Sequence, residues 1–478
     1  MLFNTLRFFI FFAIVYGLYL LLDRKKQNIL LLLASYVFYC FWDWRFLGLI
    51  LLSTGFNYVL GLRIGEAGTQ RKKRFFLILS LCCNLGMLGF FKYYDFFIQG
   101  LSGLLSLIGL NTGPLTLNII LPLGISFYTF QAMSYPIDIY RGVIKPTRKP
   151  VDFGLFIAFF PQLVAGPIER ARNLLPQFAR KRDITPEKFY EGCWLIFWGL
   201  FKKIVVADTL ARFTGSVFGS GGIYPGGQAL VSTWLYALQV YVDFSGYSNM
   251  ARGLARVMGI DLMTNFKTPF FSKNLYDLWQ RWHISLTTWI KEYVYYPIAL
   301  TSYGGKRLPA SLSIIITWAI MGFWHGAAWT FILWGVYHGV LLVAYNKIRP
   351  RLKHFEPRRP AAVSALNALK MFTVFNLFSL GILFFALKEA VNVWTVTTRI
   401  FKDLFSWNWS ALNGQLLSFL ALLLLPVAIL EYFQYRTGNE YVIFRLPVPA
   451  RVAVYIFLVY LMINYGDFNA QKYYYFQF

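Results

Sequence analysis

Apolar runs of membrane-spanning length recur along almost the whole chain. A spanning helix needs about 20 predominantly apolar residues. The candidate spans cover 3–22, 28–42, 46–63, 75–92, 117–135, 190–207, 228–248, 364–387, 413–432 and 449–465. Only 14% of the 478 residues are charged, against roughly 25% in a soluble domain. The sequence therefore predicts an all-α, polytopic integral membrane protein without a soluble domain.

Clusters of Lys and Arg between the runs predict the orientation of the chain. Cytoplasmic loops of membrane proteins carry an excess of these residues. The clusters lie at 71–74, 141–149, 170–182, 306–307 and 349–359. Placing them in the cytoplasm puts both termini on the outer side. The net charge of +25 then reflects topology and contact with the lipid bilayer, and we expect no nucleic-acid partner.

Three polar segments interrupt the pattern. Residues 311–346 lie between two basic clusters, so they should form an in-and-back hairpin or a pair of short helices that breaks near Gly322 and Gly326. Residues 159–170 and 249–308 are too polar to span simply and predict interfacial or re-entrant helices. Their aromatic residues can wall a tunnel, or they can form the usual aromatic belt at the membrane interface.

Two histidines lie in polar-aromatic islands inside apolar sequence. His283 follows Trp282 in the island 279–289, and His325 lies between Trp324 and Gly326 in the island 322–329. An ionisable side chain at membrane depth is costly and indicates a functional site. Imidazole can move a proton near neutral pH. We expect catalysis here; the alternative is a histidine buried for packing or placed at the lipid interface.

The other candidate residues have structural interpretations. One straight helix would separate His338 from His325 by about 20 Å and roughly 140°, so His338 suits helix packing or an indirect hydrogen bond. His354 lies in a basic loop and should be solvated. Asp243 ends an apolar run and could pair with Arg252 or Arg281 to hold a tunnel wall. The sequence contains no metal-ligand spacing and no Gly-x-Ser-x-Gly elbow.

These islands belong to an ordered set of motifs. The chain resembles the membrane-bound O-acyltransferase superfamily, in particular the bacterial branch that acetylates alginate. The other matching segments are Gly124–Gln131, Asp138–Gly142, Phe160–Gln162, Ala165–Arg170, Asp243–Ser248 and Tyr473–Phe478. They follow the family's order and cover most of the chain from about residue 120 onward.

The resemblance implies a fold and a reaction. It implies a single membrane domain over 1–478, with about 10–12 spans and re-entrant helices around a central tunnel. Residues 1–115 would be N-terminal helices, 116–346 the acyltransferase core, and 347–478 the C-terminal helices and tail. His325 matches the family's catalytic histidine and His283 its second polar position. The acyl group would leave on the outer face of a bacterial inner membrane, and acetyl is the acyl group that we expect.

The resemblance also suggests what binds. The acyl donor would be a cytoplasmic thioester, either acetyl-CoA or an acylated carrier protein, with no tightly bound cofactor. Arg170 and Arg172 lie where a donor phosphate would be attracted. A separate extracytoplasmic O-acetyltransferase would complete transfer to an exported polysaccharide. In the aromatic C-terminus, Tyr475 is either an acyl relay or an anchor.

Three other functions remain open. Transfer of D-alanine to a cell-wall polymer is the nearest, because the corresponding enzymes belong to the same superfamily. A transporter or lipid flippase would be favoured by inverted repeats and matched broken helices, and the sequence shows neither. A non-catalytic scaffold of a secretion complex would leave the histidines idle in a sealed core.

Overall fold

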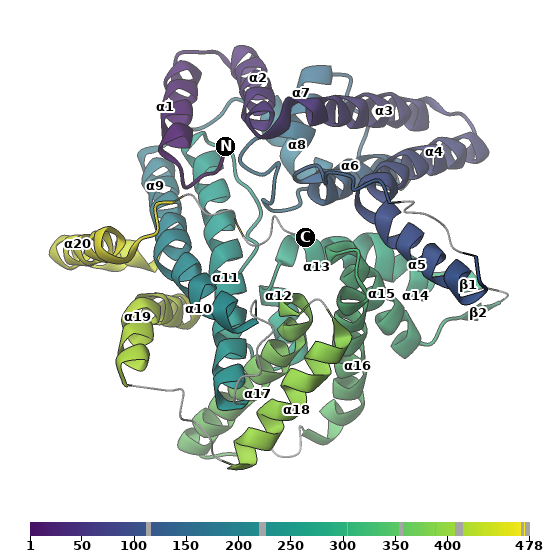
Figure 1. Cartoon of the computed structure of the whole chain (residues 1–478). Helices are drawn as coiled ribbons and strands as arrows, with labels where there is room; N and C mark the ends of the chain where they lie inside the picture. Colours follow the sequence, from purple (N-terminus) through teal and green to yellow (C-terminus); the bar gives the residue numbers. More distant parts are fainter. Residues whose placement is uncertain are drawn as a thin grey trace. The chain divides into compact units, whose positions relative to one another are not determined.

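The computed structural model describes residues 1–110, 116–218, 226–303, 305–352, 357–387, 389–406, 414–469 and 473. Nearly all regular structure in these ranges is helical (Figure 1). The strands found there are the two-residue β1 (Ser302–Tyr303) and β2 (Lys306–Arg307), which pair antiparallel. The all-α prediction is confirmed. His354, Tyr475 and the rest of 474–478 lie outside the described residues.

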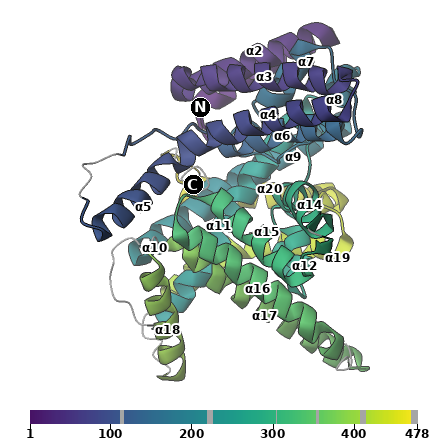
Figure 2. The same ribbon diagram turned by 90° about the vertical axis from the view of Figure 1, so that its right-hand side faces the viewer.

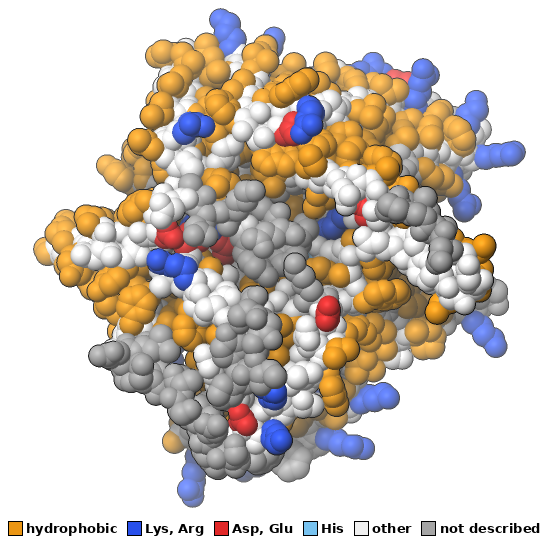
Figure 3. All heavy atoms as spheres, viewed as in Figure 1, with side chains coloured by type: hydrophobic (Ala, Val, Ile, Leu, Met, Phe, Trp, Pro, Cys, Tyr) orange, Lys and Arg blue, Asp and Glu red, His pale blue; other side chains and the backbone are white. Residues whose placement is uncertain are grey.

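Six helical stretches in the described chain are long and apolar enough to cross a membrane. They are Arg24–Glu66, Gln70–Leu107, Trp329–Leu352, Pro360–Ala386, Ser418–Thr437 and Val448–Tyr465, and Leu6–Leu20 and Ala310–His325 are shorter apolar helices. Large hydrophobic side chains face outward, as on α20 (Val448–Tyr465), where Ile456 and Ile463 are exposed. Hydrophobic side chains cover much of the face shown in Figure 3. The chain is a multi-pass membrane protein.

One predicted span begins later than the sequence suggests. The apolar run over 117–135 predicted helix throughout, but α6 is Ile125–Tyr140. Pro122 and Gly124 precede it, and Gly124 has a left-handed backbone (φ 77°) with no room for a side chain against the carbonyl of Leu163. Proline also disfavours helix in the residue before it. The hydrophobic pattern identified the segment, and this turn sets its start.

The helices group into two compact units. The first comprises Met1–Phe197 and Ser248–Met263. Its helices are α1 (Leu6–Leu20), α2 (Arg24–Asp43), α3 (Leu47–Glu66), α4 (Gln70–Leu88), α5 (Tyr94–Leu107), α6, α7 (Pro150–Ala158), α8 (Ala171–Ala179) and most of α9 (Pro186–Phe201), with the short turns η1 (Trp44–Phe46) and η2 (Gly89–Tyr93). Helices α3, α4 and α6 pack on one another (Figure 2). Asn57 of α3 bonds to Ser80 and Asn84 of α4, which satisfies buried polar groups inside an apolar unit.

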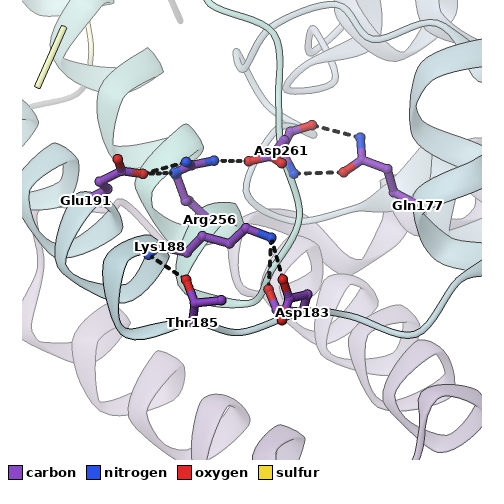
Figure 4. Close-up of polar contacts among 7 residues, drawn as sticks. All are labelled: Gln177, Asp183, Thr185, Lys188, Glu191, Arg256 and Asp261. Carbon is purple, nitrogen blue, oxygen red and sulfur yellow. Dashed lines mark hydrogen bonds and ion pairs between the residues drawn. The ribbon is translucent and has the colours of Figure 1, made fainter.

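A polar network ties three helices of the first unit together. Arg256, near the end of α11 (Gly226–Val257), lies between Glu191 of α9 and Asp261 (Figure 4). The backbone N–H of Asp261 donates to Gln177 of α8, which in turn donates to the Asp261 carbonyl oxygen. Such a network at helix ends satisfies groups that the helices cannot satisfy themselves.

The second unit comprises Trp198–Tyr247 and Thr264–Phe478. Its helices are η3 (Lys202–Ala207), α10 (Asp208–Phe218), η4 (Pro269–Phe271), α12 (Leu275–Arg281), α13 (Ile284–Ile290), η5 (Lys291–Tyr295), α14 (Tyr296–Leu300), α15 (Ala310–His325), α16 (Trp329–Leu352), α17 (Pro360–Ala386), α18 (Ala390–Ser406), α19 (Gly414–Thr437), η7 (Val442–Arg445) and α20. The first part of α11 also belongs to it. The short helices from α12 to α14 replace a simple span, as the polarity of 249–308 predicted.

Helices α15 and α16 form the predicted hairpin and lie side by side (Figures 1 and 2). Glycines let their backbones approach closely. A Cβ at Gly335 would lie 3.1 Å from the Cα of Ala319, and one at Gly339 would lie 3.1 Å from the Cα of Ile315. The chain turns between them at Gly326, where an added Cβ would overlap the ring of Phe331. The break leaves His325 at the very end of α15.

Candidate active site

Histidine and tryptophan rings alternate inside the second unit. The ring of Trp324 lies 6.4 Å from that of His283 and 5.0 Å from that of His325, between ring centroids. Trp334 lies 5.0 Å from His325 and 5.0 Å from His338. All five side chains are buried. The structure thus brings both histidine islands together, as expected of one site.

His283 occupies a strained position between α12 and α13. Its backbone is left-handed (φ 42°, ψ 53°), which is uncommon for any residue other than glycine. The backbone N–H of Ile284 donates to the carbonyl oxygen of Asn265, so the segment before η4 holds this turn. The ring packs edge-on against Phe244 of α11 at 4.7 Å. Strain held by surrounding contacts is typical of functional sites.

Asn265 determines which nitrogen of His283 can accept a proton. Its Oδ1 accepts hydrogen bonds from the backbone N–H and the hydroxyl of Ser285 and lies 3.2 Å from His283 Nδ1. Because that oxygen only accepts, Nδ1 carries the hydrogen and Nε2 carries the lone pair. Burial lowers the pKa of His283 to about 3, so the ring is neutral near pH 7. Asn265 is a site residue that the sequence analysis missed, because no pattern marks a lone Asn in a loop.

His325 ends α15 among aromatic rings. Besides the two indoles, the ring of Phe385 of α17 lies 5.2 Å away. Only 7% of the residue is exposed. The C-terminal end of a helix carries partial negative charge, which favours the positive charge that an imidazole gains when it takes a proton. The role of His325 as a general base stays a prediction.

One straight helix does not join His325 to His338, because α15 ends at His325 and α16 begins at Trp329. The chain folds back at Gly326, and both histidine rings lie 5.0 Å from the ring of one hairpin residue, Trp334. The packing role itself is what the structure shows: His338 is fully buried, and the rings of Trp279 and Trp318 lie 4.9 and 5.7 Å from it. Neither of its ring nitrogens has a hydrogen-bond partner within the described part of the chain.

A cleft opens beside this stack within the second unit. It has about 830 Å³ of empty space, its open mouth included. Its lining is mostly apolar and aromatic with a few polar groups: Tyr276, Trp279, Gln280, Thr287, Ile290, Lys291, Tyr295, Ile314, Thr317, Trp318, Met321 and Leu342. Four of these residues form a stripe along α15 that ends at Met321. His325 lies one helical turn further on the same face of α15 and is not itself a lining residue.

Asp243 has a partner that the sequence did not suggest. Its carboxylate accepts a hydrogen bond from Lys203 of η3 at 2.9 Å, and the Lys203 ammonium also binds Asp208 at 2.7 Å. Arg281 binds Asp277, four residues before it on α12. The neighbouring Trp282 packs between Phe266 and Phe378. Lys203 was missed because the sequence shows it only as part of a basic pair at the end of a span.

The two arginines proposed near the donor differ in exposure. Arg170 is buried (1% exposed), and its guanidinium donates to the carbonyl oxygen of Ile168. It is therefore not a surface cation. The Arg172 side chain is one third exposed and lies 4.0 Å from the Asp138 carboxylate. The donor role of this segment stays a prediction, with Arg172 as its more accessible member.

The aromatic C-terminus docks where the structure describes it. Tyr473 is 1% exposed, and its ring lies 5.0 Å from that of Tyr247 of α11. Tyr475 is outside the described residues, so neither its relay role nor its anchor role is tested. Among the described residues, no group of three or more His, Cys, Asp and Glu side chains could hold a metal ion.

Comparison with known proteins gives a consistent result. The model of the membrane-bound O-acyltransferase (MBOAT) family matches residues 143–387, which include both histidine islands. The probable alginate O-acetylase AlgI of Pseudomonas aeruginosa is 39% identical over 434 residues, covering 90% of this chain and 80% of that protein. The peptidoglycan O-acetyltransferase of Helicobacter pylori is 35% identical, covering 77% and 74%. The teichoic acid D-alanyltransferase of Bacillus subtilis is 29% identical, covering 48% and 60%.

Proposed function

Because this chain belongs to the membrane-bound O-acyltransferase family, we propose that it moves an acetyl group from a thioester across the membrane for O-acetylation of an exported polysaccharide, with His325 as the general base. The observation that carries the proposal is the position of His325. It lies buried at the end of a broken helix, inside the segment that matches the family, and one helical turn beyond Met321, which lines the cleft.

The reaction we propose is acyl transfer from a thioester to an oxygen. The imidazole of His325 takes the proton of the acceptor hydroxyl while the hydroxyl oxygen forms a bond to the thioester carbonyl carbon. The carbon–sulfur bond then breaks, and the proton passes to the departing thiolate. His283 carries a lone pair on Nε2 and no charge near neutral pH, so its role is to orient a donor group or His325 through a hydrogen bond.

For the donor we propose a cytoplasmic thioester on a phosphopantetheine arm, carried by CoA or by an acyl carrier protein. The cleft supports this choice, because a long chain with two amides suits an apolar groove with hydroxyl groups at Thr287 and Thr317 and an ammonium at Lys291. Filling the groove with Thr317→Trp should raise the donor concentration needed for half-maximal rate. An unchanged donor dependence would place the donor elsewhere.

The relatives support our proposals for the acceptor and for the setting of the reaction. Two of those reported are named for O-acetylation of a polysaccharide, and they match more of this chain at higher identity than the D-alanyltransferase does. We therefore favour acetyl over D-alanyl transfer. We also propose a bacterial inner membrane, both termini on its outer side, and a separate extracytoplasmic protein that completes transfer to sugar.

Tyr475 enters the proposal as an acyl relay. A phenyl ester is a better leaving group than a sugar ester, so an acetylated tyrosine on the outer side could pass its acyl group onward. The position of Tyr473 supports this, because its ring lies 5.0 Å from that of Tyr247 of α11.

The function is tested by mass spectrometry of surface polysaccharide from cells with and without the protein. We expect loss of an O-linked acetyl group in its absence. Loss of D-alanine instead would select the alternative transferase. Identical polysaccharide in both strains would refute acyl transfer to this class of acceptor.

A further inference from the structure

A buried lysine, Lys203 of η3, lies against Tyr473 in the C-terminal segment. The Lys203 ammonium is held by Asp208 and Asp243, and all three side chains are at most 3% exposed. A buried ammonium requires paired carboxylates and well-formed hydrogen bonds, because its desolvation is expensive. The π-helical turn η3 supplies the unusual placement, and π turns of this kind are frequent at functional sites.

Besides the two carboxylates, the ring of Tyr473 covers the Lys203 ammonium. Its Nζ lies 4.5 Å from the centroid of the Tyr473 ring, which is within range of a cation–π interaction. The same ring meets Tyr247 edge-on. Tyr473 thus fits a socket made of one cation and one aromatic side chain.

The segment after α20 touches the same turn a second time. The backbone N–H of Asp467 donates to the carbonyl oxygen of Ile204 at 2.8 Å. Gly466 makes this approach possible, since an added Cβ would lie 3.3 Å from the Cδ1 of Ile204 and would overlap the Met462 carbonyl oxygen. The tail is therefore fixed to η3 at Asp467 and again at Tyr473.

We propose that Lys203, Asp208, Asp243 and Tyr247 form a docking site for the C-terminal segment, and that Lys203 is a positioning residue for acyl transfer. Asp243 and Tyr247 are neighbours on α11, and Phe244 between them contacts the ring of His283. Tyr473 therefore docks about one helical turn along α11 from a residue that contacts His283. The docking half stands on the contacts alone; the positioning half rests on the proposed function.

The neighbouring lysine provides a matched control. Lys202 belongs to the same turn, is equally buried, and forms an ion pair with Glu431 of α19 at 3.2 Å. It also donates to Ser245. Lys202→Met therefore removes a buried, paired ammonium from η3 without touching the socket of Tyr473.

The first measurement is the rate at which a carboxypeptidase removes C-terminal residues from the full chain in detergent or nanodiscs. Loss of the cation–π contact in Lys203→Met should accelerate release by about tenfold, and Lys203→Arg should restore the slow rate. Lys202→Met should release at the wild-type rate. Because Lys203→Met leaves two buried carboxylates and can misfold, Tyr473→Leu and Tyr473→Phe form a second pair. The Tyr473→Leu variant should lose its C-terminal residues quickly, and the Tyr473→Phe variant should lose them slowly.

The second measurement is acetyl transfer by the same variants. Lys203→Met and Tyr473→Leu should lower kcat, expressed per mole of folded protein, without changing the KM for the donor, and the conservative Tyr473→Phe should keep the wild-type kcat. Wild-type release rates in both variants would overturn the docking site. Fast release with unchanged kcat would overturn the positioning role. If wild-type protein transfers no acetyl, the proposed function fails while the release rates still decide the docking site.

Discussion

Replacing His338 with leucine should leave both the stability and the acyl transfer of the protein close to wild type. The imidazole is enclosed by aromatic rings, and Gly381 of α17 lies so close that an added Cβ would meet Nε2 at 2.7 Å. Neither ring nitrogen finds a partner among the described residues. His338 therefore contributes packing, but its two ring nitrogens are buried without hydrogen bonds to the described residues, which is unfavourable.

The stabilising and destabilising effects of the leucine substitution nearly cancel. An unsatisfied buried polar group costs about 1–3 kcal/mol, and leucine removes that cost. Leucine also loses edge-to-face contacts such as the one with Trp334, each of which contributes about 0.5–1.5 kcal/mol. We expect the free energy of unfolding to change by less than about 1 kcal/mol with His338→Leu. His338→Ala leaves a cavity and should lower it by about 3 kcal/mol.

The assay combines thermal unfolding of the purified variants with surface acetylation in cells. The account predicts that alanine destabilises, that leucine does not, and that the leucine variant still acetylates. Loss of acetylation in a leucine variant of normal stability would refute the packing role and make His338 part of the chemistry. Equal destabilisation by both variants would show that its nitrogens do have partners.

Three further outcomes are expected. The pKa of His283 is depressed to about 3 in the folded protein, so the unfolded state binds more protons below about pH 6.5. The contribution of His283 to the free energy of unfolding should fall by about 1.4 kcal/mol per pH unit from about pH 6.5 to about pH 3. The pH dependence of thermal unfolding should be smaller by this amount in His283→Asn. Arg172→Glu should raise the donor concentration needed for half-maximal rate. Arg63→Glu, at an exposed arginine distant in sequence, is the control and should not. If both variants have the same kinetics, Arg172 contributes only to the orientation of the chain in the membrane. Tyr475→Phe should abolish acetylation if the hydroxyl carries the acyl group, and full acetylation would reduce Tyr475 to an anchor.

Hydrophobic patterning and glycine placement were enough to predict the helical class and the α15–α16 hairpin. Each depends on local chemistry: a run of apolar residues must be helical in a bilayer, and the glycine at 326 allows a break beside His325. The late start of α6 was not predictable from hydropathy, because Leu117, Ile119 and Ile120 are as apolar as a span requires.

The partners inside the site depended on tertiary structure. Adjacent helical residues point in different directions, so Lys202 meets Glu431 while Lys203 meets Asp243. Both acids are far away in sequence, and charge alone could not choose between them and an arginine partner for Asp243. Arg170 shows the converse: counting basic residues identified a basic loop but could not reveal that this one is buried.

The most direct test of the central claim is surface acetylation in a strain whose only copy of the protein carries His325→Ala, compared with His338→Leu from the same hairpin. We predict no detectable acetyl on the polysaccharide with His325→Ala, at normal membrane levels of the protein, and near-normal acetyl with His338→Leu. Normal acetylation with His325→Ala would contradict the assignment of His325 as the general base.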